Sequence, residues 1–330
     1  MPARLLQWKA TMEVSREQTF TLGGELRGQR LDQVLVAHMQ GWSRTRLQEL
    51  IKEGRVRLSG AEVTKPGHLI EAACELVIAL PPEQGSVMPS GLEPRVIFED
   101  EHLAALDKPA GLLSHANSGG REGGVAEWAA ARWGELPHLE EEERAGLAHR
   151  LDRDTSGVLL IAKTQAALES LKAAFQARAV QKTYLALVQG MTRFDSEWIE
   201  NWIGRDEKSR DRIRVLPEGE GRFSSTYYET RERFKDFSYL AVFPKTGRMH
   251  QVRVHMASIG FPLLGEHVYK PARKHLTPLP PEAPQMERHA LHASALDLVH
   301  PVTGETLHFE SPMPADMQAV LEWLRKNRPE

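Results

Sequence analysis

The sequence predicts an α+β protein built around a mixed, largely antiparallel sheet with helices packed on it. Three observations lead to this fold class. Beyond Arg95, short apolar segments of strand length outnumber the segments with helical periodicity. The two kinds of segment do not alternate strictly, as they would in a doubly wound parallel sheet. The 330 residues allow two domains, and the pair Pro81-Pro82 opens a polar stretch between the two parts.

Periodicity also places the individual elements. Apolar residues at helical spacing predict one helix that contains Leu31 and Leu35 and ends before Gly41, and a second from an N-cap at Ser43 to a stop at Gly54. Short strands are expected at 56–58, 75–80, 95–98, 103–106, 158–163, 183–189, 226–231, 239–243, 296–299 and 306–309. Further helices are expected at 124–133, 165–176, 249–259 and 314–326.

Composition narrows the class of protein. The single cysteine, Cys74, excludes an internal disulfide and fits a reducing compartment. The chain begins Met-Pro-Ala-Arg without the apolar segment of a signal peptide. No apolar run approaches the roughly eighteen residues that a membrane helix needs. We therefore expect a cytoplasmic protein without membrane contact, and we expect it to be monomeric.

The net charge of −3 argues by itself against a nucleic-acid-binding protein, but the charge is unevenly distributed. Between Arg27 and His68 the basic residues are Arg27, Arg30, Arg44, Arg46, Lys52, Arg55, Arg57 and Lys65. The acidic residues of the same region are Asp32, Glu49, Glu53 and Glu62. This region is therefore locally basic, as an RNA-binding module would be.

The segment AHRLDRDTSGVLLIAKT at 148–164 combines a charged turn with an apolar strand. Asp152 and Asp154 stand among arginines, and Gly157 allows a sharp turn before the run from Val158 to Ala162. Neighbouring cations keep a carboxylate ionised, which suits a nucleophile or a base. The residues alone do not rank Asp152 above Asp154.

The motif HRLDRDTSG, together with FEDEHLAALDKPAGLLSH at 98–115, resembles the RluA family of RNA pseudouridine synthases. Later segments resemble the same family in the same order: KTY at 182–184, KTGRMHQVRVHMASIGFPLLGE at 245–266, RHALHA at 288–293 and HPVTGE at 300–305. The resemblance spans about residues 94–312 and implies the pseudouridine synthase fold. One departure is the turn Gly265-Glu266-His267-Val268-Tyr269-Lys270, where the family has Gly-Asp-x-x-Tyr-Gly.

The resemblance implies roles for individual residues. Asp152 matches the catalytic aspartate, Tyr184 the tyrosine that packs on the flipped base, and Arg150 the arginine that enters the RNA stack. A basic residue is expected to pair with the aspartate; the helical pattern favours Arg253 over Arg248, because Arg253 faces away from the apolar stripe. The reaction implied is an isomerisation, so no cofactor and no metal are expected.

The N-terminal part resembles the S4 RNA-binding domain, through Arg30-Leu31-Asp32, Ser43-Arg44, Gly54-Arg55-Val56 and Lys65-Pro66. The basic residues expected to contact RNA there are Arg30, Arg44, Arg46, Arg55 and Arg57. We expect a flexible tail at 1–17, the S4-like domain at 18–82, a linker at 83–93 and the catalytic domain at 94–330.

Some alternatives remain open at this stage. The favoured substrate is large-subunit ribosomal RNA, because members of the family with an S4 module often act there, and transfer RNA is the second choice. A non-catalytic, ribosome-associated RNA-binding factor is a rival reading. A metallohydrolase is disfavoured, because His250 and His255 are five residues apart, whereas zincin-type helical ligands are four apart. The modified position, and attack at C1′ or at C6, are undetermined.

Overall fold

The computed structural model describes residues 16–39, 42, 44–80, 88–116, 122–138, 145–207, 209–269 and 276–330. The expected N-cap at Ser43, most of the N-terminal tail and residues 81–87 lie outside these ranges. Contacts divide the chain into two compact units, and the second consists of Met88–His115 and Gly123–Glu330. The two units are described separately below.

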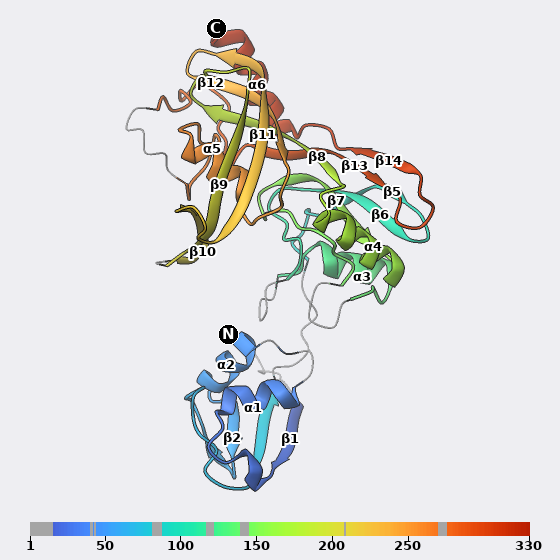
Figure 1. The fold of residues 1–330 in the computed structure, drawn as a ribbon, viewed down its shortest axis with the longest axis vertical. Helices are drawn as coiled ribbons and strands as arrows, with labels where there is room; N and C mark the ends of the chain where they lie inside the picture. Colours follow the sequence, from blue (N-terminus) through green and yellow to red (C-terminus); the bar gives the residue numbers. More distant parts are fainter. Residues whose placement is uncertain are drawn as a thin grey trace, which may run out of the picture. The chain divides into compact units, whose positions relative to one another are not determined.

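The N-terminal unit is a small antiparallel sheet with two helices (Figure 1). Its elements are β1 (Arg16–Leu22), the 3-10 helix η1 (Gly24–Leu26), α1 (Leu31–His38), α2 (Arg44–Lys52), β2 (Val56–Leu58), β3 (Ala61–Glu62) and β4 (Cys74–Leu80). The strands are ordered β1-β4-β2-β3. Both expected helices and both expected strands are present, whereas β1 and β3 were not predicted.

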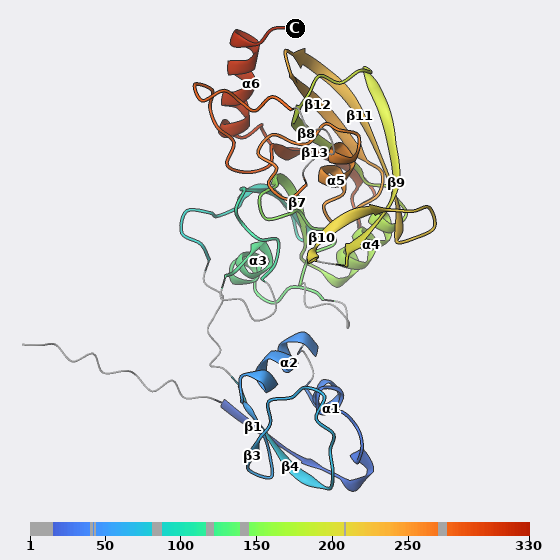
Figure 2. The ribbon, with the colours of Figure 1, turned by 90° about the vertical axis from the view of Figure 1, so that its left-hand side faces the viewer.

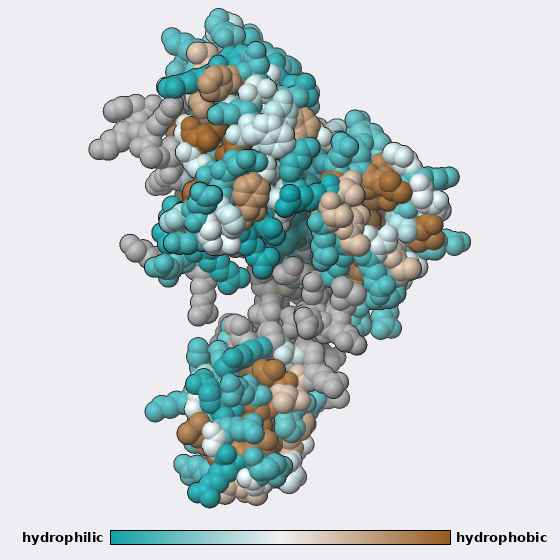
Figure 3. Space-filling model, viewed as in Figure 1, coloured by the Kyte–Doolittle hydropathy of each residue, from teal (hydrophilic) through white to brown (hydrophobic). Residues whose placement is uncertain are grey.

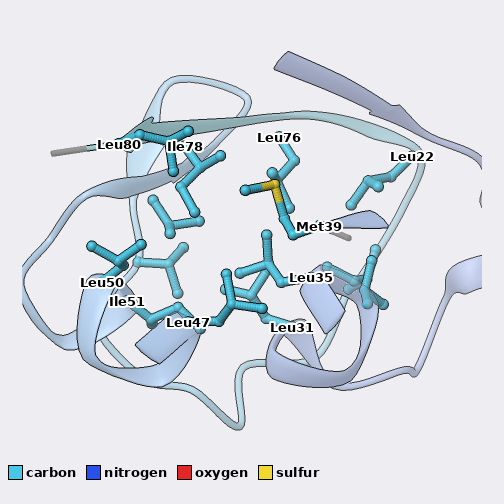
Figure 4. Close-up of a cluster of buried hydrophobic side chains, with 14 residues drawn as sticks. Leu22, Leu31, Leu35, Met39, Leu47, Leu50, Ile51, Leu76, Ile78 and Leu80 are labelled. Carbon is cyan, nitrogen blue, oxygen red and sulfur yellow. The ribbon is translucent and has the colours of Figure 1, made fainter. Parts of the chain in front are cut away.

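The core of this unit follows from the helical spacing of its apolar residues. Leu31 and Leu35 of α1 and Leu47 of α2 point toward Leu76 and Ile78 of β4 (Figure 4). All five side chains are buried. Each helix therefore covers the sheet with one apolar face and leaves its polar face outward.

The second unit contains one ten-stranded sheet and four helices among its described residues. The strands are β5 (Arg95–Glu99), β6 (Leu103–Lys108), β7 (Ser156–Ala162), β8 (Gln181–Gln189), β9 (Ser196–Asp206), β10 (Ser209–Leu216), β11 (Arg222–Phe234), β12 (Phe237–Pro244), β13 (Leu291–Val299) and β14 (Thr306–Glu310). The helices are α3 (Val125–Trp133), α4 (Gln165–Gln176), α5 (Gln251–Ser258) and α6 (Ala315–Asn327).

The strand order is β10-β9-β11-β12-β8-β13-β7-β6-β5, with β14 paired to β13. Among the described strands of this sheet, β7 and β13 form a parallel pair, and all other neighbouring strands are antiparallel. The predicted fold class is therefore confirmed. The four predicted helices agree with α3 to α6 within two residues at each end.

Two strands of this sheet, β9 and β10, were not predicted. In β9 the buried Ile199 and Ile203 share one face with the half-buried Asn201, and Trp198 and Trp202 lie on the other. Polar and large apolar residues therefore occur on both faces, so the apolar–polar alternation that marks a half-buried strand is missing.

Helices cover both faces of the sheet (Figures 1 and 2). Alternate residues of β7 pack in two different clusters, Leu160 with Leu168 of α4 and Leu159 with Val125 of α3. This two-sided burial explains the continuous apolar run of β7. In β8, Ala186 and Val188 pack with α5, and Leu187 packs with α6.

The face of the molecule shown in Figure 3 is mainly polar where its residues are coloured. On the face shown in Figure 3, hydrophobic residues occur in small separate groups among hydrophilic ones. No helix within the described ranges is long and apolar enough to cross a membrane.

The parallel pair of β7 and β13 requires a glycine at its start. Gly157 pairs with Ala293 and has a φ of +115°. A Cβ atom at Gly157 would lie 2.1 Å from the carbonyl oxygen of Ala293. Because this oxygen belongs to the backbone of a buried strand, it cannot move aside cheaply, and the glycine fixes how the 152–156 turn joins the sheet.

We predict that Gly157→Ala destabilises the second unit by at least about 3 kcal/mol, because it adds a backbone clash to an unfavourable φ. The matched control is Gly304→Ala, where φ is +79° and no atom lies within 4 Å of the new Cβ. The control should lose only about 1 kcal/mol. Urea unfolding of both variants measures the difference, and equal losses would contradict the clash.

Candidate active site

Asp152 lies in a turn whose backbone is held from behind. The ammonium of Lys108 donates to the carbonyls of Arg153 (2.8 Å), Leu112 (2.8 Å) and Pro109 (2.9 Å). Ser114 donates to the carbonyl of Leu151 at 2.7 Å and accepts from its amide at 3.0 Å. The residues on either side of Asp152 are therefore tied to the 108–114 segment.

Lys108 was not singled out in the sequence, although it lies in the family-like segment LDKPAG. Its side chain is fully buried. Burial lowers the pKa of Lys108 to about 7, and the negative charges of Asp154 and Asp152 act in the opposite direction. The partners of Lys108 are three backbone carbonyl oxygens and not the carboxylates of Asp152 and Asp154. Lys108 therefore holds the backbone of the turn and does not bind either carboxylate directly.

The carboxylate of Asp152 is held from the front by Arg253 of α5. The Nη1 of Arg253 donates to Oδ2 of Asp152 at 3.1 Å, and its Nε and Nη2 donate to Glu266 at 2.8 and 2.9 Å. The side chains of Arg253 and Glu266 are only 8% and 1% exposed, and that of Asp152 is 18% exposed. Arg248, the second choice from the sequence, has no hydrogen bond to Asp152 in the described structure.

Burial and ion pairing have opposite effects on the pKa values of Arg253 and Glu266. Burial acts to lower the pKa of Arg253, but the hydrogen bond and charge of Glu266, followed by Asp152, outweigh it, so that pKa lies above its usual value. Burial acts to raise the pKa of Glu266, and the hydrogen bond and charge of Arg253 reverse this effect. Both groups therefore stay charged at neutral pH.

The other oxygen of Asp152 faces His250. The hydroxyl of Tyr269 accepts from the amide of Ile213 at 3.1 Å and is hydrogen-bonded to Nδ1 of His250 at 2.5 Å. The Nε2 of His250 lies 3.8 Å from Oδ1 of Asp152. Burial lowers the pKa of His250, and the charge of Asp152 opposes the shift.

Tyr184 of β8 lines the same cavity as Asp152. Its hydroxyl has no hydrogen-bond partner among the described residues. Burial, and then the negative charge of Asp152, raise the pKa of Tyr184 above its ordinary value. The phenol therefore keeps its proton at neutral pH, and its hydroxyl is available to a ligand.

The cavity has a volume of about 580 Å³, the size of a small-ligand site. Its lining includes Asp152, Tyr184, Arg253, Arg150 and Arg248, all five of the site residues expected in this unit. Arg150 and Arg248 come from the turn before β7 and from the segment before α5. The structure thus brings together residues that are up to 103 positions apart in the sequence.

The arginines expected to bind RNA in the N-terminal unit each have an acidic partner there. Arg30 and Arg44 both bond to Asp32, which is fully buried. The other pairs are Arg46 with Glu49 and Glu53, Arg55 with Glu53, and Arg57 with Glu17. The guanidinium-bearing side chains of Arg30 and Arg44 are still 46% and 52% exposed, so pairing does not remove them from solvent.

The histidines that a metal site would need have other roles. No group of His, Cys, Asp and Glu in the described residues could hold a metal ion. His149 accepts from the amide of Leu160 at 3.0 Å, His255 bonds to Ser224 at 2.7 Å, and His289 bonds to Thr155 at 2.8 Å. Each of them holds a turn, strand or helix in place.

Comparisons with known proteins identify the class. Residues 102–258 match the family model described as RNA pseudouridylate synthase, and residues 29–73 match the S4 domain. The chain is similar to human RNA Pseudouridylate Synthase Domain Containing 4, with a TM-score of 0.54, 22% identity, and coverage of 70% of this chain and 93% of that one. That structural likeness supports the fold.

Closer relatives specify the family. "Ribosomal large subunit pseudouridine synthase D" of Pseudomonas aeruginosa is 37% identical over 313 residues, which cover 92% of this chain and 94% of the relative. "Uncharacterized RNA pseudouridine synthase YlyB" of Bacillus subtilis is 35% identical over 308 residues, 93% of this chain and 98% of the relative. The chain belongs to the RluA family and is an RNA pseudouridine synthase with an S4 domain.

We predict that acid destabilises the second unit through its buried histidines. Burial lowers the pKa of His149 and His289 to about 3 and that of His255 to about 4. The unfolded chain, with histidine pKa values near 6.5, binds these protons first, so stability falls as the pH drops from 6.5 toward 4. At pH 5 each histidine should cost about 2 kcal/mol.

The measurement is urea unfolding at several pH values between 4 and 6.5. His149→Gln should reduce the slope of the unfolding free energy against pH by the contribution of one proton, because the glutamine amide does not titrate. The control is His308→Gln: the carboxylates of Asp297 and Glu310 raise the pKa of the exposed His308, so this histidine is protonated in both states below pH 6. A slope that His149→Gln leaves unchanged would contradict the prediction.

Proposed function

We propose that this enzyme converts specific uridines of large-subunit ribosomal RNA to pseudouridine, with Asp152 as the nucleophile and the target base turned out of the RNA into the cavity. The observation that carries the proposal is the carboxylate of Asp152, fixed by Arg253 at 3.1 Å and lining the same cavity as Tyr184. A nucleophile held rigidly in a cavity that admits one base is what this isomerisation needs.

The reaction breaks the N1–C1′ bond of uridine, rotates the uracil and forms a C5–C1′ bond. The proton of C5 leaves, and N1 gains one, so the net change is an isomerisation. Asp152 attacks C1′ or C6, and both routes require an ionised, aimed carboxylate. No oxidant, reductant or water is consumed, so the proposal includes no cofactor.

Glu266 gives Arg253 a second role in this reaction. When Asp152 forms a covalent bond to the nucleotide, it loses its negative charge. Arg253 still pairs with Glu266 at 2.8 and 2.9 Å, so no unpaired cation is left buried beside the intermediate. The arginine can therefore hold Asp152 before attack and remain in place after it.

Tyr184 and Arg150 are proposed to act on the extruded nucleotide. The ring of Tyr184 stacks on the uracil, and its hydroxyl takes part in transfer of the C5 proton. Arg150, an exposed residue of the cavity lining, enters the RNA stack in place of the base. A planar cation there offsets part of the few kcal/mol that base flipping costs.

Ribosomal RNA is proposed as the substrate because several relatives are named for the large ribosomal subunit and because the S4 domain adds an RNA-binding unit. Its arginines Arg30, Arg44, Arg46, Arg55 and Arg57 are proposed to contact RNA phosphates. The site of action would then be the cytoplasm. Pseudouridine mapping in RNA from cells that lack the gene tests this: loss confined to transfer RNA would overturn it.

We predict that Asp152→Asn lowers turnover by at least about three orders of magnitude, because the nearly isosteric amide is not a nucleophile. Release of tritium from RNA labelled at C5 of uridine measures it, and a filter-binding assay checks that RNA affinity is retained. Asp154→Asn is the matched control and should stay active. Equal loss in Asp154→Asn, or clear activity in Asp152→Asn, would contradict the assignment.

We predict that Tyr184→Phe lowers turnover by about a hundredfold or more, because it removes the hydroxyl but keeps the ring. Tyr184→Ala should in addition lose about 1–3 kcal/mol of base stacking, seen as weaker binding of the RNA. The same tritium assay, with kcat and KM determined separately, distinguishes the two contributions. A fully active Tyr184→Phe would leave stacking as the only role.

A further inference from the structure

Basic side chains gather beside the cavity of the second unit. Besides Arg150 and Arg253, four basic side chains line it: Lys172, Arg178, Lys182 and Arg248. Two more, Arg222 and Lys245, lie close enough for their charges to act on members of this group. We use the name rim cluster for Arg178, Lys182, Arg222, Lys245 and Arg248.

The rim cluster draws its members from distant parts of the chain. Arg178 follows α4, Lys182 belongs to β8, and Arg222 begins β11. Lys245 and Arg248 lie in the segment that joins β12 to α5. The ammonium of Lys182 donates to the carbonyl of Thr246 at 3.2 Å, which fixes it to that segment.

The members of the rim cluster repel one another. Burial, and then the charges of Arg222 and Arg178, lower the pKa of Arg248. Burial, and then the charge of Lys245, lower the pKa of Lys182 to about 8. The described residues place no carboxylate within ion-pair distance of any of the five, unlike the paired arginines of the N-terminal unit.

One donor of the rim cluster is buried without an acceptor. The Nε of Arg248 is shielded from solvent and has no hydrogen-bond partner in the described structure, although the side chain lines the cavity. A buried donor without a partner costs stability, and so does like-charge repulsion. In a chain with a net charge of −3, three cations that line one cavity, Arg178, Lys182 and Arg248, with Arg222 and Lys245 close to them and no carboxylate partner among the described residues, point to an anionic ligand.

We propose that the rim cluster binds a backbone phosphate of the RNA, next to the nucleotide whose base enters the cavity. The proposal rests on the proposed function and specifies a part of the substrate that the catalytic residues do not contact. Phosphate fits because arginine offers it paired donors and lysine offers it a point charge. A base edge can also accept hydrogen bonds from arginine and lysine, but a base is uncharged and would leave the like charges of the cluster unneutralised.

A phosphate bound at the rim cluster would restrain the backbone of the extruded nucleotide. An extruded nucleotide remains attached to its strand through its two phosphates. Fixing one of them keeps the backbone in the flipped geometry while the uracil detaches and rotates. The rim cluster should therefore act mainly on RNA binding and on KM, whereas kcat on saturating RNA should depend on Asp152 and its neighbours.

The test replaces the exposed members Arg178 and Arg222 by glutamine, singly and together, in the full-length protein. Arg193→Gln is the matched control, because Arg193 is exposed, does not line the cavity and, unlike Arg178 and Arg222, is not among the charges that act on Arg248. The first measurement is the affinity for uridine 3′,5′-bisphosphate and for uridine by calorimetry. The second is tritium release from ribosomal RNA between 50 and 200 mM salt.

We expect the wild type to bind the bisphosphate more tightly than uridine, and each substitution to weaken bisphosphate binding about tenfold while uridine binding stays the same. Each substitution should also raise KM and lower the slope of log(kcat/KM) against log salt by roughly 0.7–0.9. Wild-type bisphosphate affinity and salt slope in the double variant, or equal losses in Arg193→Gln, would overturn the proposal.

The phosphate site and the proposed enzyme function can be contradicted independently of each other. Calorimetry with the bisphosphate needs no turnover, so a cluster-dependent affinity would support the phosphate site even if tritium release were absent. Tritium release that is normal in the wild type and has an unchanged salt slope in the variants would support the proposed function and overturn the phosphate site.

Discussion

The catalytic unit depends on one buried cation, Arg253, shared between two carboxylates. The isolated charge would be expensive to bury, so Arg253 needs at least one partner that is always present. Glu266 is that partner, since its oxygens also accept from the amides of Val268 and Tyr269. Asp152 is the second partner, and under the proposed mechanism it can lose its charge while Glu266 still pairs with Arg253.

The rigidity of Asp152 comes from both of its sides. Lys108 and Ser114 hold the backbone of the turn, and Arg253 holds one carboxylate oxygen. His250, with its left-handed backbone at φ 54°, faces the other oxygen just before α5 begins. These contacts fix the direction in which the carboxylate points, so little reorganisation is needed when a ligand enters the cavity.

Sequence reasoning worked where local pattern determines structure. The apolar run of β7 follows from its burial on both faces, and the helical spacing of Leu47, Leu50 and Ile51 follows from burial of one helix face against the sheet. The charged turn before a buried strand drew attention to Asp152 and Asp154 together, and only the family resemblance favoured Asp152. The helix face chosen for Arg253 also agrees with its contact to Asp152, 101 residues away.

The sequence did not predict which residues from different segments contact each other. The bond of Arg253 to Glu266 was missed, although the turn at 265–270 had been noted as a departure from the family. Lys108 looked like any lysine at a strand end, because its role depends on a contact with the carbonyl of Arg153, 45 residues away, in addition to the nearby carbonyls of Pro109 and Leu112. Strands β9 and β10 were missed because both of their faces carry polar and apolar residues.

The number of basic residues in a segment also did not show which of them are paired with carboxylates in the structure. The N-terminal unit is locally rich in arginine, yet Arg30 and Arg44 converge on the buried Asp32 and so contribute to its fold. The rim cluster is less obvious in the sequence, because its members are spread from residue 178 to residue 248. There the cations repel one another and lack carboxylate partners in the described structure, which is a cost to the folded protein. Paired arginines need RNA to compete with their own carboxylates, whereas an unpaired cluster gains from any phosphate that arrives, so the attraction for RNA should be strongest beside the cavity.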